Sequence, residues 1–425
     1  MEDWKEYKID DLCGFQNGFA FKSSDFCSDG KYRVVKIKEL KAGQVKFFED
    51  SSFVNCLDSS VIDKYSIKKN DVLFALTGDP VNKPNPQSWV GRVSIYNQEE
   101  ESLLNQRVCK AMPKEGLDSF FLYYYFRQND VFYALASKAT GSASLANIST
   151  KTIGDIHIRI PSLIEQKRIV NILKSLDDKI ENNRRINENL EQQAQALFKS
   201  WFVDFEPFKD QPFVESELGM IPQGWRVQEA QQIFNINIGK TPPRKESEWF
   251  SESKEDNVWV SIADMGSCGA FISDSSEYLT DEAVRRFNVQ MVEKDSILLS
   301  FKLTVGRVAI ADTRLTTNEA IARFILPKKF YREFLYLYLK QYKYGNLGST
   351  SSIATAVNSK TIKGMRLLIP NVELIESFSK NTRPLFEQIR TIQQESRRLA
   401  ELRDTLLPRL MSGELKVNDL ENNEI

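Results

Sequence analysis

The sequence predicts an α+β protein in which two similar mixed α/β globular domains are joined by two long antiparallel helices, forming a pseudo-twofold internal repeat. Two observations lead to this prediction. The two halves of the 425-residue chain carry the same motifs in the same order. Each half then changes from strand-like alternation to an apolar seam at helical spacing. A chain of this length can also build two or three domains, each with its own core.

The repeat is clearest around one glycine–arginine motif. Val90–Ile95 reads VGRVSI, and Val305–Ile310 reads VGRVAI. An apolar run after a polar turn precedes each motif, at 68–76 and 293–301, and predicts a buried strand. An aromatic segment and a small polar loop follow. Near the end of the first half stand five residues that recur in type at positions 360, 361, 362, 369 and 370: Lys151, Thr152, Ile153, Ile160 and Pro161.

Long helices are predicted after Pro161 and Pro370. Two apolar positions per heptad suit the packing of one helix on another. Residues 163–202, as one helix, would span about 60 Å. Pro384 should kink the second helix or mark its true start. The predicted domains are 1–161 (first globular domain), 162–212 (central helical spacer), 213–370 (second globular domain) and 371–425 (C-terminal helical spacer).

Two asparagines in the first seam, Asn183 and Asn187, leave two interpretations open. Asn183 facing Ile392 would set the register of the helices, as one polar seam residue does in coiled coils. Alternatively, both asparagines belong to an exposed polar face.

Composition excludes several classes of protein. No run of 18 apolar residues is present, so no membrane-spanning helix is predicted. Five scattered cysteines without a C-x-x-C spacing indicate reduced thiols, not disulfides or a zinc site. The N-terminal segment MEDWKEYKIDDL lacks the apolar core of a signal peptide, and we expect a cytoplasmic protein. The net charge is −1, so any basic surface must be local.

The sequence contains no complete catalytic signature. The one histidine, His157, lies in a strand-like segment without a nucleophile motif and is expected to be structural. The segment IGKTPP resembles the end of a phosphate-binding loop, but Phe234 occupies the first glycine position and two prolines block the helix that must follow. Asp177 and Asp178 lie in the predicted helix, where we expect both carboxylates to face solvent. The sequence therefore predicts a chain that is not an enzyme.

Three helical motifs carry a resemblance to a known family. ALFKSWFVDFEPF, followed by SELGMIPQGWRV at 216–227, closely resembles the central region of the specificity subunits of type I restriction–modification systems. LRDTLLPRLMSGEL at 402–415 resembles the C-terminal end of that family, and PSLIEQKRIVNILKSLDDKIENN at 161–183 resembles its helix entry. YRVVKIKEL, NDVLFALTG and GSASLANIS fit its recognition domains. The resemblance covers nearly the whole chain.

The resemblance implies a non-catalytic reader of double-stranded DNA. Each globular half would be a target recognition domain for one part of a split DNA sequence, and the helices would set the spacing between the parts. The helices would also dock two adenine-N6 methyltransferase subunits. The family's complex recruits ATP-dependent motor–nuclease subunits. S-adenosylmethionine, ATP and Mg are expected on the partner subunits, and no cofactor or metal on this chain.

DNA contacts are predicted at loop tips, because base reading uses Arg, Lys, Asn and Gln while other cations and hydroxyls position phosphates. In the first half the candidates are Lys83, Arg92, Asn105, Gln106, Arg107, Thr140, Ser142 and Ser144. In the second half they are Lys240, Arg244, Lys245, Lys302, Arg307, Asn318, Ser349, Thr350, Ser351 and Ser352. The arginines that recur in both halves, Arg92 and Arg307, could equally buttress the shared fold.

Apolar residues at the helix ends are predicted to dock partners. They are Trp201, Phe202, Phe205, Leu406 and Leu410, and the first three would pack either into the next recognition domain or into a methyltransferase. The aromatic helices at 120–126 and 331–344 are expected to pack in the core instead of stacking on bases, because their spacing places most rings on one face.

Two alternative functions stay open at this stage. The chain could be the specificity subunit of a system whose partner fuses methyltransferase and nuclease in one polypeptide. It could also be a coiled-coil protein-interaction adaptor, which predicts no salt-dependent affinity for DNA.

Overall fold

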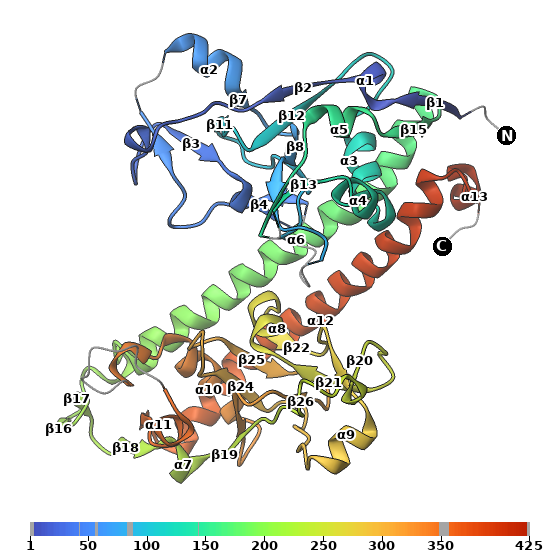
Figure 1. The fold of residues 1–425 in the computed structure, drawn as a ribbon. Coiled ribbons are helices and arrows are strands. Elements are labelled where there is room, and N and C mark those ends of the chain that lie inside the picture. The colour runs from blue at the N-terminus through green and yellow to red at the C-terminus, as the bar shows by residue number, and fades with distance from the viewer. Residues whose placement is uncertain are drawn as a thin grey trace. The chain divides into compact units, whose positions relative to one another are not determined.

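The chain divides into two compact units. The computed structural model describes residues 4–41, 43–55, 58–82, 88–142, 144–347 and 357–422 (Figure 1). The first unit comprises residues 1–178 together with 399–425, and the second comprises residues 179–398. Each unit therefore combines one globular domain with parts of both long helices.

The globular part of the first unit is built from small sheets. Its main sheet has the strand order β2 (Cys13–Asn17), β12 (Val108–Pro113), β8 (Val72–Ala75), β10 (Val93–Ile95), β5 (Gln44–Val45), β4 (Leu40–Lys41). A second sheet has the order β6 (Phe53–Val54), β3 (Tyr32–Val35), β11 (Ser102–Leu104), β7 (Ser66–Ile67). A third has the order β13 (Thr140–Ser142), β14 (Leu145–Asn147), β9 (Thr77–Gly78), and β1 (Lys5–Lys8) pairs with β15 (His157–Ile160).

Short helices complete this unit: α1 (Ile9–Leu12), α2 (Ser59–Tyr65), α3 (Ser119–Arg127), α4 (Asn129–Ala136), α5 (Thr150–Gly154) and α13 (Val417–Asn422). Helix α3 begins where Asp118 accepts hydrogen bonds from the backbone amides of Phe120 and Phe121, at 2.9 and 3.0 Å. Its aromatic residues are mostly buried, and the ring of Phe126 meets Phe74 of β8 edge to face at 4.9 Å.

The second unit repeats this plan. Its main sheet has the order β19 (Asn235–Ile238), β27 (Ile321–Ile325), β24 (Ile297–Ser300), β25 (Val308–Ala311), β22 (Phe271–Ile272). The second sheet has the order β20 (Phe250–Ser251), β23 (Tyr278–Leu279), β21 (Asn257–Val260), β26 (Thr316–Thr317). β18 (Arg226–Glu229) pairs with β28 (Arg366–Ile369), and β16 (Phe213–Ser216) pairs with β17 (Gly219–Pro222). The helices are α7 (Ala230–Ile233), α8 (Ile262–Ser267), α9 (Asp281–Arg286), α10 (Tyr331–Gln341) and α11 (Ser359–Lys363).

The pairing pattern confirms the repeat. β10 pairs with β5 in parallel, as β25 does with β22, and β11 pairs with β3 in parallel, as β21 does with β26. The antiparallel centre, β2–β12–β8, matches β19–β27–β24. The predicted fold class, two similar mixed domains with two long antiparallel helices, is thus confirmed.

One glycine in each copy allows two backbone segments to touch. A Cβ atom on Gly18 would lie 2.1 Å from the carbonyl oxygen of Asn105, and one on Gly239 would lie 2.0 Å from that of Asn318. No side chain fits at such a distance, so glycine is required at both positions. The predicted motif residues Asn105 and Asn318 therefore occupy the same place in the two copies.

Helix α6 has the predicted extent, from Leu163 to Phe202. Helix α12 runs from Val372 to Met411, inside the predicted spacer 371–425. They run antiparallel in each unit. In the first unit Asp177 of α6 bonds to Arg403 of α12, and Arg168 bonds to Asn418 of α13, the helix that follows α12. In the second unit Asn183 bonds to Glu395, and the ring of Trp201 meets Phe378. Helix α12 starts twelve residues before Pro384, so that proline does not mark its beginning.

Polar residues of α6 differ from expectation. Asn183 is 1% exposed and its amide donates to Glu395 Oε2 at 2.7 Å, so the exposed-face interpretation is wrong for this residue. Asp177 was expected to face solvent, but its side chain is 19% exposed and contacts two arginines. The reason is that polar residues of distant elements reach this face of the helix, where they bury the carboxylate and neutralise its charge.

Each globular core closes on both long helices. In the first unit Ile169, Val170 and Leu173 of α6 and Leu407, Leu410 and Met411 of α12 join the core of the domain. In the second unit Ala194, Phe198 and Phe202 of α6 and Ile375, Phe378 and Phe386 of α12 do the same. The aromatic helices α3 and α10 are core elements, as predicted.

Candidate nucleic-acid interface

In the second unit three backbone segments meet at one end of the main sheet. The Lys240 amide donates to the Thr317 carbonyl at 2.9 Å, and the Phe301 amide donates to the Ala320 carbonyl at 2.9 Å. Three predicted DNA-binding residues, Lys240, Lys302 and Asn318, are brought to this end. The lysine side chains are exposed, whereas Asn318 is half-buried and its Oδ1 accepts from the Ala320 amide at 3.1 Å.

The first unit forms the equivalent sheet end. The Gln106 amide donates to the Phe19 carbonyl, and the Leu76 amide donates to the Arg107 carbonyl, both at 2.9 Å. The hairpin β13–β14 joins this end because Asn147 pairs with Thr77 of β9. The predicted residues gathered here are Asn105, Gln106, Arg107, Thr140, Ser142 and Ser144, and all except half-buried Asn105 are exposed.

The two repeated arginines support the fold in the same way. A guanidinium nitrogen of Arg92 donates to the carbonyl of Ile37 at 3.3 Å, and Arg307 Nη1 donates to the carbonyl of Ile262 at 2.6 Å. Both carbonyls start the short helical turn after the equivalent strand, β3 or β21. Burial lowers the pKa of the Arg92 guanidinium. This geometry is that of the buttress, and DNA contact by either arginine stays a prediction.

The loop GKTPPRK presents its cations unequally. Arg244 Nη1 lies 2.8 Å from both carboxylate oxygens of Glu277, and its guanidinium stacks on the rings of Phe250 and Trp259 at 4.3 and 4.5 Å. Lys240 and Lys245 are exposed. Trp259 Nε1 donates to the Lys240 carbonyl at 3.1 Å and so fixes the start of the loop. The remaining predicted DNA-binding residues lie outside the described residues: Lys83, Ser349, Thr350, Ser351 and Ser352.

The connection between the two central strands differs most between the copies. Residues 77–89 join Leu76 to Val90 in the first unit, whereas 302–304 alone join Phe301 to Val305 in the second. In the short connection Leu303 is 99% exposed and has a φ of 59°. The Ser300 hydroxyl donates to the Thr304 carbonyl at 2.6 Å and closes the turn. The apolar side chain of Leu303 is thus exposed to solvent, and its backbone is in a strained conformation.

Replacing Leu303 by glycine should stabilise the chain. A left-handed conformation costs an L-residue about 1–2 kcal/mol, and glycine avoids this cost. Glycine also raises the conformational entropy of the unfolded chain, which offsets about 0.4–1 kcal/mol of the gain. The expected net gain in the free energy of unfolding is about 0.5–1 kcal/mol, measured by chemical denaturation. Leu303→Ala keeps the Cβ atom and should change little. An equal gain in both variants would contradict the strain argument.

Some of the predicted partner-docking residues are buried within this chain. Phe202 is 5% exposed and meets Phe334 and Phe378 edge to face, and Leu410 is fully buried in the first unit. The aromatic end of α6 therefore packs into the second domain, the first of the two alternatives. Trp201, Phe205 and Leu406 are half-buried. A docking role stays a prediction for these three.

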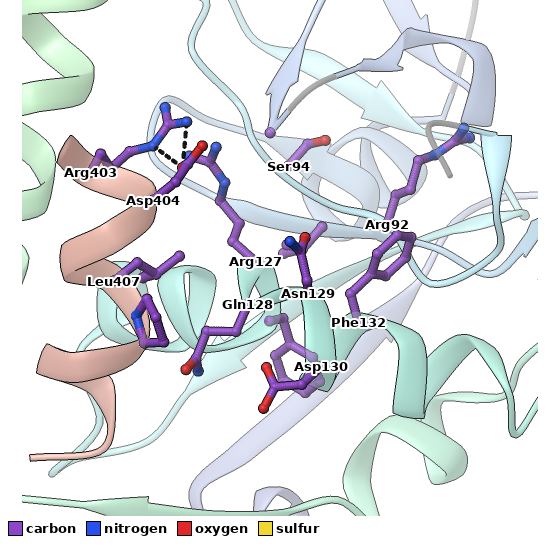
Figure 2. Close-up of a pocket in the computed structure, with 14 residues that line it drawn as sticks. Arg92, Ser94, Arg127, Gln128, Asn129, Asp130, Phe132, Arg403, Asp404 and Leu407 are labelled. Atoms are coloured by element: carbon purple, nitrogen blue, oxygen red, sulfur yellow. Dashed lines mark hydrogen bonds and ion pairs between the residues drawn. The ribbon is translucent and has the colours of Figure 1, made fainter. Parts of the chain in front are cut away.

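A pocket of about 660 Å³ in the first unit was not anticipated (Figure 2). It is lined by α3, α4, β10 and the part of α12 around Arg403. Asp177 Oδ2 accepts from the Tyr124 hydroxyl at 2.9 Å and from Arg127 Nη1 at 3.1 Å, while Oδ1 accepts from Arg403 Nη1 at 2.6 Å. Figure 2 shows Arg403 also bonded to Asp404. Two of the arginines that line the pocket, Arg127 and Arg403, are therefore held by carboxylates.

Two searches of the described part of the chain bear on other kinds of site. Among the residues that the structure describes, no group of three His, Cys, Asp or Glu side chains could hold a metal ion. No helix within the described ranges is long and apolar enough to cross a membrane.

Comparison with known proteins identifies chains of similar sequence and a solved structure of similar fold. The chain is 31% identical over 328 residues to the type I restriction enzyme MjaIX specificity subunit of Methanocaldococcus jannaschii, which covers 74% of this chain and 73% of that protein. It is 26% identical over 485 residues to the HindI specificity subunit of Haemophilus influenzae, which covers 98% of this chain and all of that protein. The crystal structure of a type I restriction-modification S subunit from M. genitalium shares the fold, with a TM-score of 0.53, 17% identity and 96% coverage of each chain.

The family match itself follows the internal repeat. The sequence profile described as the type I restriction modification DNA specificity domain matches residues 1–192 and 222–395, once for each half of the chain. The resemblance noted from the helical motifs is thereby confirmed. The chain belongs to the family of type I restriction–modification specificity subunits.

Proposed function

We propose that this chain is the non-catalytic subunit that reads a split DNA target for a type I restriction–modification enzyme, one part of the target by each unit. The observation that carries the proposal is the pair of equivalent sheet ends. Both are built on the same hydrogen-bonded frame, yet they present different polar side chains and connections of different length. A shared frame with different exposed edges suits two readers of different half-sites.

The partners follow from the family and from the duplication. Two copies of one frame offer two equivalent places for one kind of partner, which supports two adenine-N6 methyltransferase subunits. We further propose that ATP-dependent motor–nuclease subunits join this assembly. S-adenosylmethionine, ATP and Mg would then be bound by the partners, and a complex that acts on genomic DNA would work in the cytoplasm.

Base-resolved adenine methylation of the host genome tests this function. Deleting the gene should remove methylation from one split motif and leave other marks in place. Re-expression should restore that motif, which also reveals both half-sites. A genome in which no methylated motif depends on the gene, despite an active methyltransferase, would overturn the proposal.

A second experiment separates the alternatives. The co-purified complex should bind the split motif more tightly than a scrambled duplex, and its affinity should fall as salt rises. An adaptor would show neither property. Co-purification of one long polypeptide with both methyltransferase and nuclease regions, in place of separate subunits, would identify the fused partner.

A further inference from the structure

A second pocket lies beside the sheet end of the second unit. Its volume is about 230 Å³, and its polar lining includes Asn237, Lys240, Asn288, Gln290 and Arg323. Lys240 is exposed, while Arg323 is 4% exposed in the middle of strand β27. The pocket therefore joins an exposed ammonium group to a buried guanidinium.

Arg323 has no negatively charged partner in the described structure. Its Nη1 donates to the Gln290 carbonyl and its Nη2 to the Ile238 carbonyl, both at 2.7 Å. Its Nε has no hydrogen-bond acceptor. Burial lowers the pKa of this guanidinium. A buried charge with neutral acceptors alone is costly, because carbonyl dipoles do not replace a counter-charge.

The same unit pairs its other deeply buried arginine fully. Arg332, with a side chain 6% exposed, contacts the carboxylates of Asp295, Glu333 and Glu387 at 2.6 to 2.7 Å. The carboxylate of Glu319, which is not among the residues that line the pocket, accepts from the Thr241 hydroxyl. Of these two deeply buried arginines, Arg323 is therefore the one without a carboxylate partner among the described residues.

The first unit has a different residue, with a different partner, at the position equivalent to Arg323. Lys110 occupies the place of Arg323, since each pairs with the equivalent leucine, Leu73 or Leu298. Lys110 Nζ lies 3.4 Å from Asp71 and donates to the Ser66 carbonyl at 3.0 Å. The position of Asp71 is held by Ser296 in the second unit, which removes the carboxylate. The first unit therefore supplies its own anion, whereas the second has no carboxylate at the equivalent position.

We propose that this pocket binds a phosphate group, with Lys240 and Arg323 as the charged donors and the neighbouring amides as neutral ones. The source of the phosphate is the backbone of the target DNA at the second half-site, and in this respect the inference rests on the proposed function. A phosphate supplies the negative charge that Arg323 lacks among the described residues, and charge-assisted bonds to phosphate are among the stronger hydrogen bonds. The contact positions the second unit on the duplex without reading a base.

Binding by the purified complex with its partner subunits tests the pocket. The variants are Lys240→Met, which changes an exposed residue, and Arg323→Gln, whose folding is checked by circular dichroism. Lys329→Met, an exposed lysine beyond the opposite end of β27, is the matched control. Dissociation constants for the target duplex are measured at several salt concentrations and with methylphosphonate replacing each phosphate of the second half-site in turn.

The native complex should lose about tenfold in affinity when one particular phosphate is neutralised, which corresponds to about 1.4 kcal/mol. Lys240→Met should bind the unmodified duplex about tenfold more weakly, and the slope of log K against log salt should shrink by about 0.9. Neutralising that same phosphate should weaken DNA binding by the Lys240 and Arg323 variants only slightly further. The control should behave as the native complex.

Two outcomes would overturn the proposal. One is an unchanged salt slope and the native pattern of methylphosphonate effects in both pocket variants. The other is that inorganic phosphate raises the melting temperature of the native chain but not of Arg323→Gln, while DNA binding is the same for both, which would assign the pocket to a free anion. Failure of the native complex to prefer its target duplex would instead contradict the proposed function.

Discussion

Replacing Asp177 by alanine should lower the free energy of unfolding by about 3–5 kcal/mol, the usual cost of leaving buried charges without their partner. Asp177 joins three elements of the first unit: α3 through Tyr124 and Arg127, its own helix α6, and α12 through Arg403. The side chains of both arginines are less than one fifth exposed. Their charges would face each other across the gap that the carboxylate leaves.

Asp178 provides the matched control for this variant. Its side chain is 64% exposed and pairs with Lys174 one helical turn away. Exposed pairs of this spacing contribute only about 0.3–0.5 kcal/mol, so Asp178→Ala should change the midpoint of urea denaturation little. Asp177→Asn, which keeps one acceptor oxygen, should fall between the two. Equal effects of Asp177→Ala and Asp178→Ala would contradict a buried network.

Arg332→Ala should destabilise the chain by a similar amount, about 3–5 kcal/mol. Arg332 donates to Glu333, Asp295 and Glu387, and Glu333 is fully buried with the Ser379 hydroxyl as its other donor at 2.9 Å. Removal of Arg332 would leave the Glu333 carboxylate with a single neutral donor. Arg314→Ala is the control, because that arginine is 65% exposed and pairs with Glu293 at the surface.

Acid should weaken the same network. Burial alone would raise the pKa of Asp295, but hydrogen bonds from Arg332 and Arg390 outweigh it and lower the pKa. The pKa of Glu387 is lowered in the same way. A carboxyl with a depressed folded pKa stabilises fully above its unfolded value, about 3.9 for Asp, and this contribution disappears as the pH falls through the folded value. Stability should therefore decline below about pH 4, and less steeply in Arg332→Ala.

The architecture could be predicted because it depends on patterns along the chain. The repeated motifs give the two domains, and the seam gives α6 from Leu163 to Phe202 as the structure has it. The site residues could be placed only in part. Sequence order indicates that Asn105 and Asn318 follow equivalent strands, but not that Arg92 and Arg307 turn toward backbone carbonyls.

Buried polar residues on the helices were beyond the reach of local patterns. Asp177 is buried because Arg127 and Arg403 reach it from 50 and 226 residues away along the chain. Asn183 is buried because Glu395 arrives from the other helix. A heptad describes which face of a helix meets a partner, but not which charges that partner brings. Arg323 on strand β27 is a further case, since the residues around its guanidinium, and the absence of a carboxylate among those described, are visible only in space.

The closure of the first unit by residues 399–425 has a consequence for biosynthesis. A ribosome that has finished the first globular domain must still translate all of residues 179–398 before Leu407, Leu410 and Met411 exist to complete that domain's core. At about 5–20 residues per second this wait lasts roughly ten to forty seconds. The second unit, although encoded later, has all of its residues sooner. The domain that is translated first is therefore the one that is completed last. Until then the apolar surface that Leu407, Leu410 and Met411 later cover stays exposed, and a chaperone would bind the nascent chain there.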